Sequence, residues 1–107
     1  MNTNEKIAKW LGLQEKYITN FGIQWVINLE DSVPINLDFL HDRNQQGWII
    51  DELIKRGWRI KIYICEQTCE VKIWHNDDQI EVIGDNEDLD LAFISAVEQL
   101  INQEETK

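Results

Sequence analysis

Five side chains that could bind an anionic, ring-containing ligand recur at alternate positions in two neighbouring segments. They are Arg59, Lys61, Tyr63, Lys72 and Trp74. Guanidinium and ammonium groups pair with phosphate, and aromatic rings stack on nucleotide bases. We therefore expect these residues to bind a nucleotide-like ligand or a short single strand. The alternative is a face packed under the N-terminal helix or a second subunit, with the lysine stems lying along apolar surface.

Two cysteines and two histidines are the candidates for metal or redox chemistry. Cys65 and Cys69 lie at or beside one expected turn, and only His41 and His75 could complete a four-ligand zinc site. His75 is expected at the other end of its strand from that turn, so these groups do not converge. His75 with Asp77–Asp78 could bind a cation, but short acidic side chains are also typical of a hairpin turn. We expect ordinary thiols, no metal and no cofactor.

The sequence contains no catalytic signature. Its serines are Ser32, close to Pro34, and Ser95, within an expected helix. No P-loop, nucleophile elbow or glycine-rich phosphate cradle is present. Because the chain has 20 acidic residues, paired carboxylates carry no information about catalysis. We expect a non-enzymatic protein.

Alternation of apolar residues predicts that β-strands position the candidate ligand residues. The apolar members are Ile60, Ile62, Ile64, Val71, Ile73, Ile80 and Val82. A slip of one residue moves a whole strand's side chains to the other face. These residues share one face only if paired residue numbers add to an odd value. The cations and rings then point to the opposite face.

Two turns satisfy this parity. A turn centred on Gln67–Thr68 pairs Ile64 with Val71 and Ile62 with Ile73. A second turn, at Asp77–Asp78, pairs Ile73 with Val82. The sequence therefore predicts a three-stranded antiparallel meander with one apolar face.

Helices are predicted before and after the meander in the sequence. One ends at Gly57 and has Asp42 as its possible N-cap, and another begins near Glu87 after a turn at Gly84–Asn86. The last helix has a long apolar stripe: Leu89, Ala92, Phe93, Ala96, Val97, Leu100 and Ile101. A short helix is expected over residues 3–12.

The segment between the first two helices is less regular. Alternating apolar residues from Phe21 to Leu29 predict an N-terminal strand, whereas residues 13–20 are expected to be a connector. Residues 35–40, after Pro34, are expected to run over the surface with Leu37, Phe39 or Leu40 buried beneath.

Together these elements predict a single α+β domain over residues 1–107. We expect an antiparallel sheet, the three-stranded meander plus the N-terminal strand, with helices on both faces as an α-β-α sandwich. The sequence has no membrane-spanning run and no signal-peptide pattern at its N-terminus, so a cytoplasmic location is expected. The net charge of −10 repels nucleic acid at long range without excluding a local basic patch.

Three segments carry a resemblance to a known family. They are IAKWLGL near the N-terminus, LIKRGWRI at the end of the central helix, and DLDLAFISAVEQLI in the last helix. Together with the Pro-containing segment and short strands they resemble the phage ABA sandwich domain, found in small proteins of Bacillus-type phages and prophages. The resemblance implies a phage accessory protein without known catalytic residues, and it assigns no functional residue.

Two functional hypotheses follow. The first is a counter-defence protein that sequesters an anionic nucleotide-like ligand on the face formed by the five residues above. The second is an acidic inhibitor or nucleic-acid mimic that docks on a basic host protein. The acidic residues concerned are Asp77, Asp78, Glu81, Asp85, Glu87, Asp88 and Asp90. Five tryptophans are many for so small a core, so we also expect a homo-oligomer.

Overall fold

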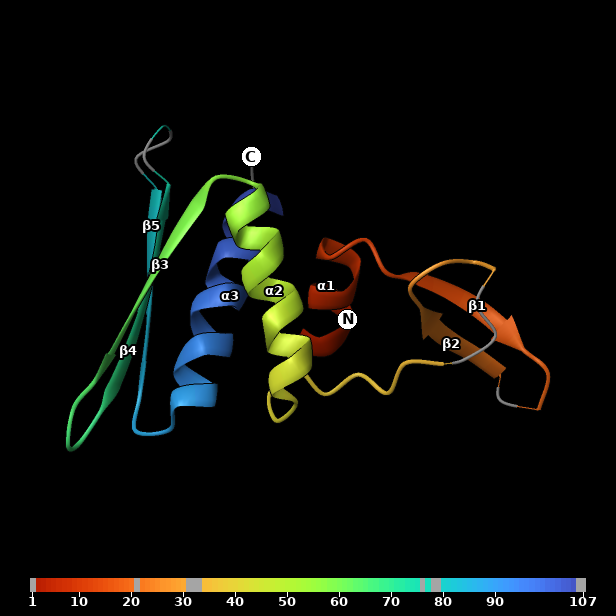
Figure 1. Cartoon of the computed structure of the whole chain (residues 1–107), viewed down its shortest axis with the longest axis horizontal. Helices are drawn as coiled ribbons and strands as arrows, with labels where there is room; N and C mark the ends of the chain where they lie inside the picture. Colours follow the sequence, from red (N-terminus) through yellow and green to blue (C-terminus); the bar gives the residue numbers. More distant parts are fainter. Residues whose placement is uncertain (1, 21, 31–33, 76, 78–79, 106–107) are drawn as a thin grey trace.

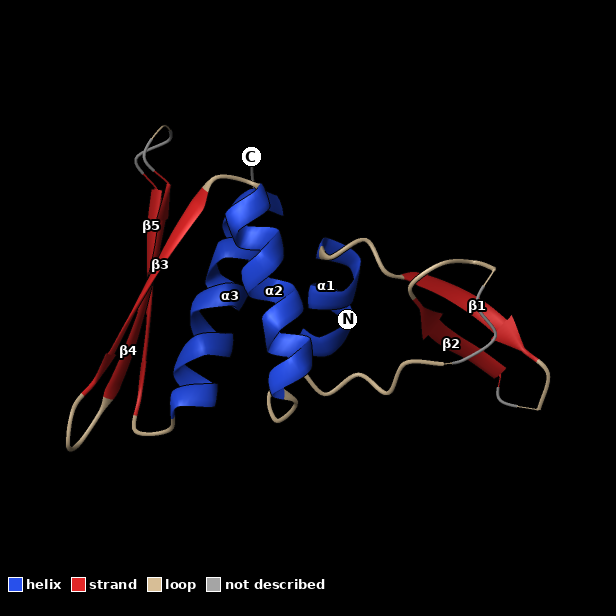
Figure 2. Ribbon diagram, in the orientation of Figure 1, coloured by secondary structure: helices blue, strands red, loops and turns tan. Residues whose placement is uncertain are grey.

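The computed structural model describes residues 2–20, 22–30, 34–75, 77 and 80–105. In these residues three helices and five strands form an α+β fold with two separate antiparallel sheets (Figures 1 and 2). The elements are α1 (Thr3–Trp10), β1 (Gln14–Ile18), β2 (Gly22–Val26), α2 (Arg43–Lys55), β3 (Trp58–Ile64), β4 (Cys69–His75), β5 (Ile80–Asn86) and α3 (Leu89–Glu105).

The predicted meander is present, with strand order β3-β4-β5. The pairing of Ile73 with Val82 is confirmed. In the first hairpin the pairs are Ile62 with Val71 and Ile64 with Cys69, so the predicted register is wrong by two residues. Since a shift of two preserves parity, every side chain keeps its predicted face.

The first turn is correspondingly tighter than expected. Residues 65–68 connect the strands, and the backbone N–H of Cys65 donates to the carbonyl of Thr68 at 2.9 Å. This centres the turn on Glu66–Gln67. It also brings Cys69 onto the inner face of β4, where its side chain is buried in the core.

The apolar face of the meander packs against α3, which contacts both β4 and β5. Most of the predicted α3 stripe is buried, and the buried members are Ala92, Phe93, Ala96, Val97, Leu100 and Ile101. The turn expected at Gly84–Asn86 is wrong, because β5 continues to Asn86. Gly84 lies against α3, where a Cβ atom would stand 1.9 Å from the carbonyl oxygen of Ala92.

The layering differs from the expected α-β-α sandwich. The helices stand on one side of the meander: α3 lies on the sheet, α2 lies beside α3, and α1 is farther out (Figure 1). No described element covers the other face of the meander. The reason is that α1, with Ile7, and α2, with Leu53, are buried in the same core as α3, which leaves no described helix for the outer face.

The expected N-terminal strand is present as β2 but does not join the meander. It pairs with β1, in the region where a connector was expected, with Tyr17 opposite Ile23. This hairpin projects from the helices at one end of a molecule measuring 46 × 32 × 22 Å (Figure 1). Tyr17 and Ile23 are 70% and 69% exposed. We refer to β1 and β2 as the hairpin arm.

The segment between the arm and α2 is anchored as expected. Phe39 is fully buried, and the side chain of Gln46 donates to the carbonyls of Phe39 and Leu40 at 3.0 and 3.1 Å. Asp42 is the N-cap of α2, as predicted, and accepts from the backbone N–H of Asn44 and Gln45. Gly57 ends this helix with a φ of 87°, which favours glycine.

Arg56 joins the ends of the three helices. Its guanidinium donates to the carbonyl of Trp10 at 2.6 Å and lies 4.3 Å from the centre of that indole ring. It also pairs with Glu52 at 2.9 Å and with Glu104 at 3.4 Å. The Trp10 Nε1–H donates to Glu104 as well, so one cation and one carboxylate fix α1 against the other helices.

Candidate ligand-binding face

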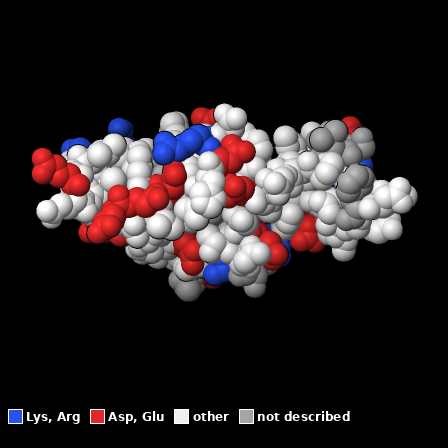
Figure 3. All heavy atoms as spheres, turned by 90° about the horizontal axis from the view of Figure 1, so that it is seen from below, with Lys and Arg blue, Asp and Glu red and all other residues white. Residues whose placement is uncertain are grey.

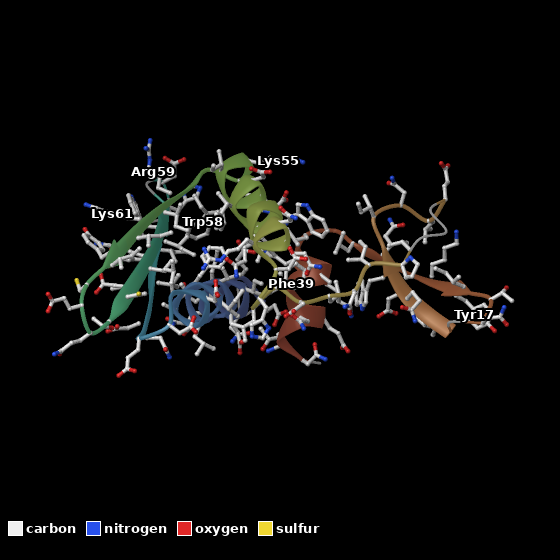
Figure 4. The ribbon with its side chains drawn as sticks, turned by 60° about the horizontal axis from the view of Figure 1, so that its bottom comes forward. Tyr17, Phe39, Lys55, Trp58, Arg59 and Lys61 are labelled. Carbon is white, nitrogen blue, oxygen red and sulfur yellow. The ribbon has the colours of Figure 1, made fainter. Side chains whose placement is uncertain are left out.

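All five predicted ligand residues lie on the uncovered face of the meander, which we call the outer face. The register places Arg59 opposite Trp74 and Lys61 opposite Lys72. Tyr63, two residues after Lys61 on β3, faces the same side of the sheet. Figure 4 shows Lys61 directed away from the helices and Trp58, on the other side of β3, directed toward them. The predicted sidedness of the strands is therefore confirmed.

Three acidic residues share this face, and the sequence interpretation missed them. Glu70 is opposite Tyr63 on β4, and β5 contributes Glu81 opposite Trp74 and Asp85 opposite Glu70. Each of them alternates along its strand with the inward-facing residues, as the cations do. The alternation in the sequence was therefore sufficient to predict that they face the same side as the cations. Among the described residues, the outer face therefore has three cations and three carboxylates. The cations lie on β3 and β4, whereas β5 contributes only carboxylates and Ile83.

Each lysine of the face lies over an aromatic ring. The Lys61 ammonium is 4.9 Å from the centre of the Tyr63 ring, and the Lys72 ammonium is 6.0 Å from the centre of the Trp74 ring. Lys72 also pairs with Glu81 at 3.3 Å. An exposed pair of this kind contributes about 1 kcal/mol or less, so a ligand phosphate could displace the carboxylate.

The two rings lie at opposite ends of a central pair of lysines. Tyr63 is four residues from Arg59, the cross-strand partner of Trp74, so the two ring-bearing residues are separated by roughly 13 Å along the strands. Lys61 and Lys72 face each other between them. The rings cannot enclose one base, but each offers a separate stacking surface with two cations in the middle.

The outer face is an open surface. Tyr63 is 41% exposed, and Trp74 is half-buried between its neighbours. A hollow of about 650 Å³ lies elsewhere, between the start of α1 and the exposed side of α3. A ligand on the outer face would therefore be held by stacking and ion pairing and remain accessible to water.

The cysteines and His75 occupy separate environments. Cys65 is an exposed free thiol, whereas Cys69 is a buried one. His75 Nδ1 accepts from the backbone N–H of Asp77, and Nε2 is 3.2 Å from the carbonyl of Arg56. Within the part of the chain that the structure describes, no three His, Cys, Asp or Glu side chains come together as metal ligands.

The predicted acidic cluster is spread along one border of the meander. Asp77, Glu81, Asp85, Glu87 and Asp88 are exposed. Asp90 is paired with Arg43 at 3.0 Å, and Asp78 lies outside the described residues. Figure 3 shows acidic side chains over the meander and the helices and largely uncharged atoms over the described part of the hairpin arm.

Comparisons with known proteins place this chain in no group. No family model, no curated protein and no solved structure matches it. The resemblance to the phage ABA sandwich domain therefore stays a prediction. Among the helices built from described residues, none has the length and apolar character needed to cross a membrane.

Proposed function

We propose that this protein is a non-enzymatic binding protein that sequesters an anionic nucleotide-like ligand on the outer face of its meander. The observation that supports this proposal most strongly is the gathering of three cations and two rings on a sheet surface that no described element covers. They are Arg59, Lys61, Lys72, Tyr63 and Trp74. Stacking and charge pairing on an open sheet are sufficient to bind nucleic-acid components.

The order of these groups favours a ligand with two bases over a mononucleotide. One base would stack on Tyr63 and the other on Trp74, while the phosphate between them pairs with Lys61 and Lys72. Arg59 would contact a terminal phosphate beside Trp74. Glu81 moves away from Lys72 in this arrangement, and its release costs little at an exposed position.

A counter-defence role in the cytoplasm of a phage-infected cell is part of this proposal. Its support is the resemblance of the IAKWLGL, LIKRGWRI and DLDLAFISAVEQLI segments described above. A protein that binds a small nucleotide signal without transforming it lowers the free concentration of that signal. Such a role requires affinity, and no catalytic group.

The test is ligand binding by calorimetry, with a dinucleotide and the matching mononucleotide as probes. We expect the dinucleotide to bind more tightly, with affinity that falls as salt rises. Trp74→Leu and Lys72→Gln should each weaken binding by about tenfold or more, because each removes a stacking surface or a phosphate partner.

Lys55→Gln is the matched control, since Lys55 is an exposed lysine on α2, away from the outer face (Figure 4). It should leave the affinity unchanged. Equal loss in the Lys55 and Lys72 variants would mean that binding depends on charge in general and would reject the outer face as the site. The same conclusion follows if the Trp74 variant binds normally.

A second function is favoured by the exposed acidic border along β5 and its turn to α3. We propose as the alternative that this border docks on a basic host protein. Replacing Glu87 and Asp88 by their amides should then abolish salt-sensitive capture of such a protein and leave dinucleotide binding intact. Capture that persists in the amide variant would reject this alternative.

A further inference from the structure

The edge strand β3 of the meander is only partly covered by the helices. β3 lies at the end of the order β3-β4-β5, so one edge of its backbone faces outward. Its inner-face side chains should belong to the core, yet Ile62 is 43% exposed and Ile64 is 71% exposed. The residues opposite them on β4, Val71 and Cys69, are buried.

The exposure has a clear cause in the packing of the helices. α3 lies under β4 and β5, and α2 contacts β3 only in a limited region, next to the turn at Gly57. The distal half of β3 therefore extends beyond the helices. An apolar edge strand of this kind is a template for pairing with another strand.

We propose that β3 pairs antiparallel with β3 of a second copy, forming a symmetric dimer with a continuous six-stranded sheet. A two-fold axis perpendicular to the sheet keeps the inner faces on one side, which restricts the register to alternatives centred on a single residue. Centring on Lys61 places two lysines directly opposite, which is unfavourable. Centring on Ile62 is the next register, and it pairs residues 60–64 of one copy with 64–60 of the other.

The register centred on Ile62 is complementary on both faces of the sheet. On the inner face Ile62 meets its own copy, and Ile60 meets Ile64. On the outer face Lys61 meets Tyr63, a favourable cation–aromatic pair.

A hollow next to β3 offers space for the projecting side chain of the second copy. It has a volume of about 400 Å³, and Ile54, Trp58 and Ile60 are among the residues that line it. Ile54 is 63% exposed there. Because Ile64 of the second copy lies opposite Ile60, its side chain is directed to this hollow, and the symmetry repeats the contact.

This dimer would also enlarge the ligand site. The outer faces of the two copies become continuous, so Arg59, Lys61 and Tyr63 from both copies meet along the seam, while the carboxylates of β5 lie at the two far borders. The ligand then contacts residues of both copies. This part of the inference rests on the proposed function, whereas the strand pairing does not.

Sedimentation equilibrium without ligand tests the pairing. A five-residue seam of about 17 Å buries less than about 1,200 Å² in total, so we expect a dissociation constant in the micromolar range. Ile62→Lys opposes two lysines at the axis and should raise it about tenfold or more. Ile23→Lys, on the equally exposed hairpin arm, should leave it unchanged.

A disulfide experiment tests the register. In a Cys65→Ser background, Ile62→Cys should form a crosslinked dimer on mild oxidation, because directly opposed Cβ atoms are about 4.5–5.5 Å apart. Ile64→Cys should not crosslink, since its two copies are separated by four residues, roughly 13 Å along the strands.

Several results would overturn the inference. They are a monomer across the micromolar range, dissociation caused by Ile23→Lys but not Ile62→Lys, and equal crosslinking of both cysteine variants. The crosslinked dimer separates the two proposals. If it forms but binds no dinucleotide, the proposed function fails and the pairing stands; if it binds no better than the uncrosslinked Ile62→Lys monomer, the shared site is rejected.

Discussion

Gly84 sets the distance between the meander and α3. It stands on the inner face of β5, in register with Val71, and its missing side chain allows the sheet to approach the helix backbone at Ala92 and Ala96. Small residues on both elements make this approach possible. At Gly84 the backbones of β5 and α3 are therefore in close contact, with no side chain of Gly84 between them.

We expect Gly84→Ala to destabilise the protein strongly. Its Cβ atom would lie 1.9 Å from the Ala92 carbonyl oxygen and 2.7 Å from the Ala96 nitrogen, which are backbone atoms that cannot rotate away. The cost should be about 3 kcal/mol or more, the upper end for overpacking. Urea unfolding followed by tryptophan fluorescence measures it.

Gly47→Ala provides the comparison for this change. Gly47 is inside α2, and a Cβ atom there meets nothing within 4 Å. Since alanine favours helix, this variant should be neutral or more stable by up to about 1 kcal/mol. A similar loss of stability in both variants would contradict the role assigned to Gly84.

Among the elements, the hairpin arm differs most from the rest of the fold. Its strands pair with each other, and Trp25 is bridged to Ile35, but the arm contributes few buried side chains to the main core. Its stability therefore depends mainly on local pairing. A two-stranded hairpin on its own is marginal in water.

Hydrogen exchange should separate the arm from the meander. We expect the backbone amides of β1 to exchange at least about a hundredfold faster than those of β4, because local opening of the arm exposes little core. Mass spectrometry of peptides covering residues 14–18 and 69–75 measures this ratio. Equal protection of the two peptides would show that arm and body open as one unit.

The sequence predicted the elements that build the core and missed β1, which contributes little to it. Apolar alternation located the meander, and the α3 stripe located the last helix, since both patterns exist to bury side chains. β1 carries the sequence QEKYI, in which no inward-facing apolar series marks a strand. Its pairing with β2 follows from the intervening turn, where Asn20 has a φ of 74°.

The candidate site was predictable to the same extent. Parity placed Arg59, Lys61, Tyr63, Lys72 and Trp74 on one face, and that survived the two-residue error in register. Parity does not predict on which face of the sheet each helix packs. α2 and α3 both have broad apolar stripes that either face of a sheet could bury, so the open outer face emerged only from the packing.

At the scale of the whole molecule, the core and the proposed binding surface lie on opposite faces of the meander. The core lies between the meander and the three helices, so substitutions on the outer face need not affect folding. This separation allows variants of Lys72 or Trp74 to be compared with the unmodified protein at nearly constant stability. It also means that a partner can approach the sheet without displacing a helix.

The rates at which the two cysteines are chemically modified can report how often the whole domain opens. Cys65 is exposed at the first turn, and Cys69, on the inner face of β4, is buried in the core. We expect a thiol reagent to modify one sulfur at once in the native protein and the second only as fast as the core opens. Absorbance of the released chromophore follows both steps.

In Cys65→Ser the rapid step should vanish while the slow one remains, and immediate modification of both thiols in the unmodified protein would contradict the buried position of Cys69. The two sulfurs thus provide one position for attaching a label to the native protein. They also provide a second position whose labelling rate reports how often the whole domain opens.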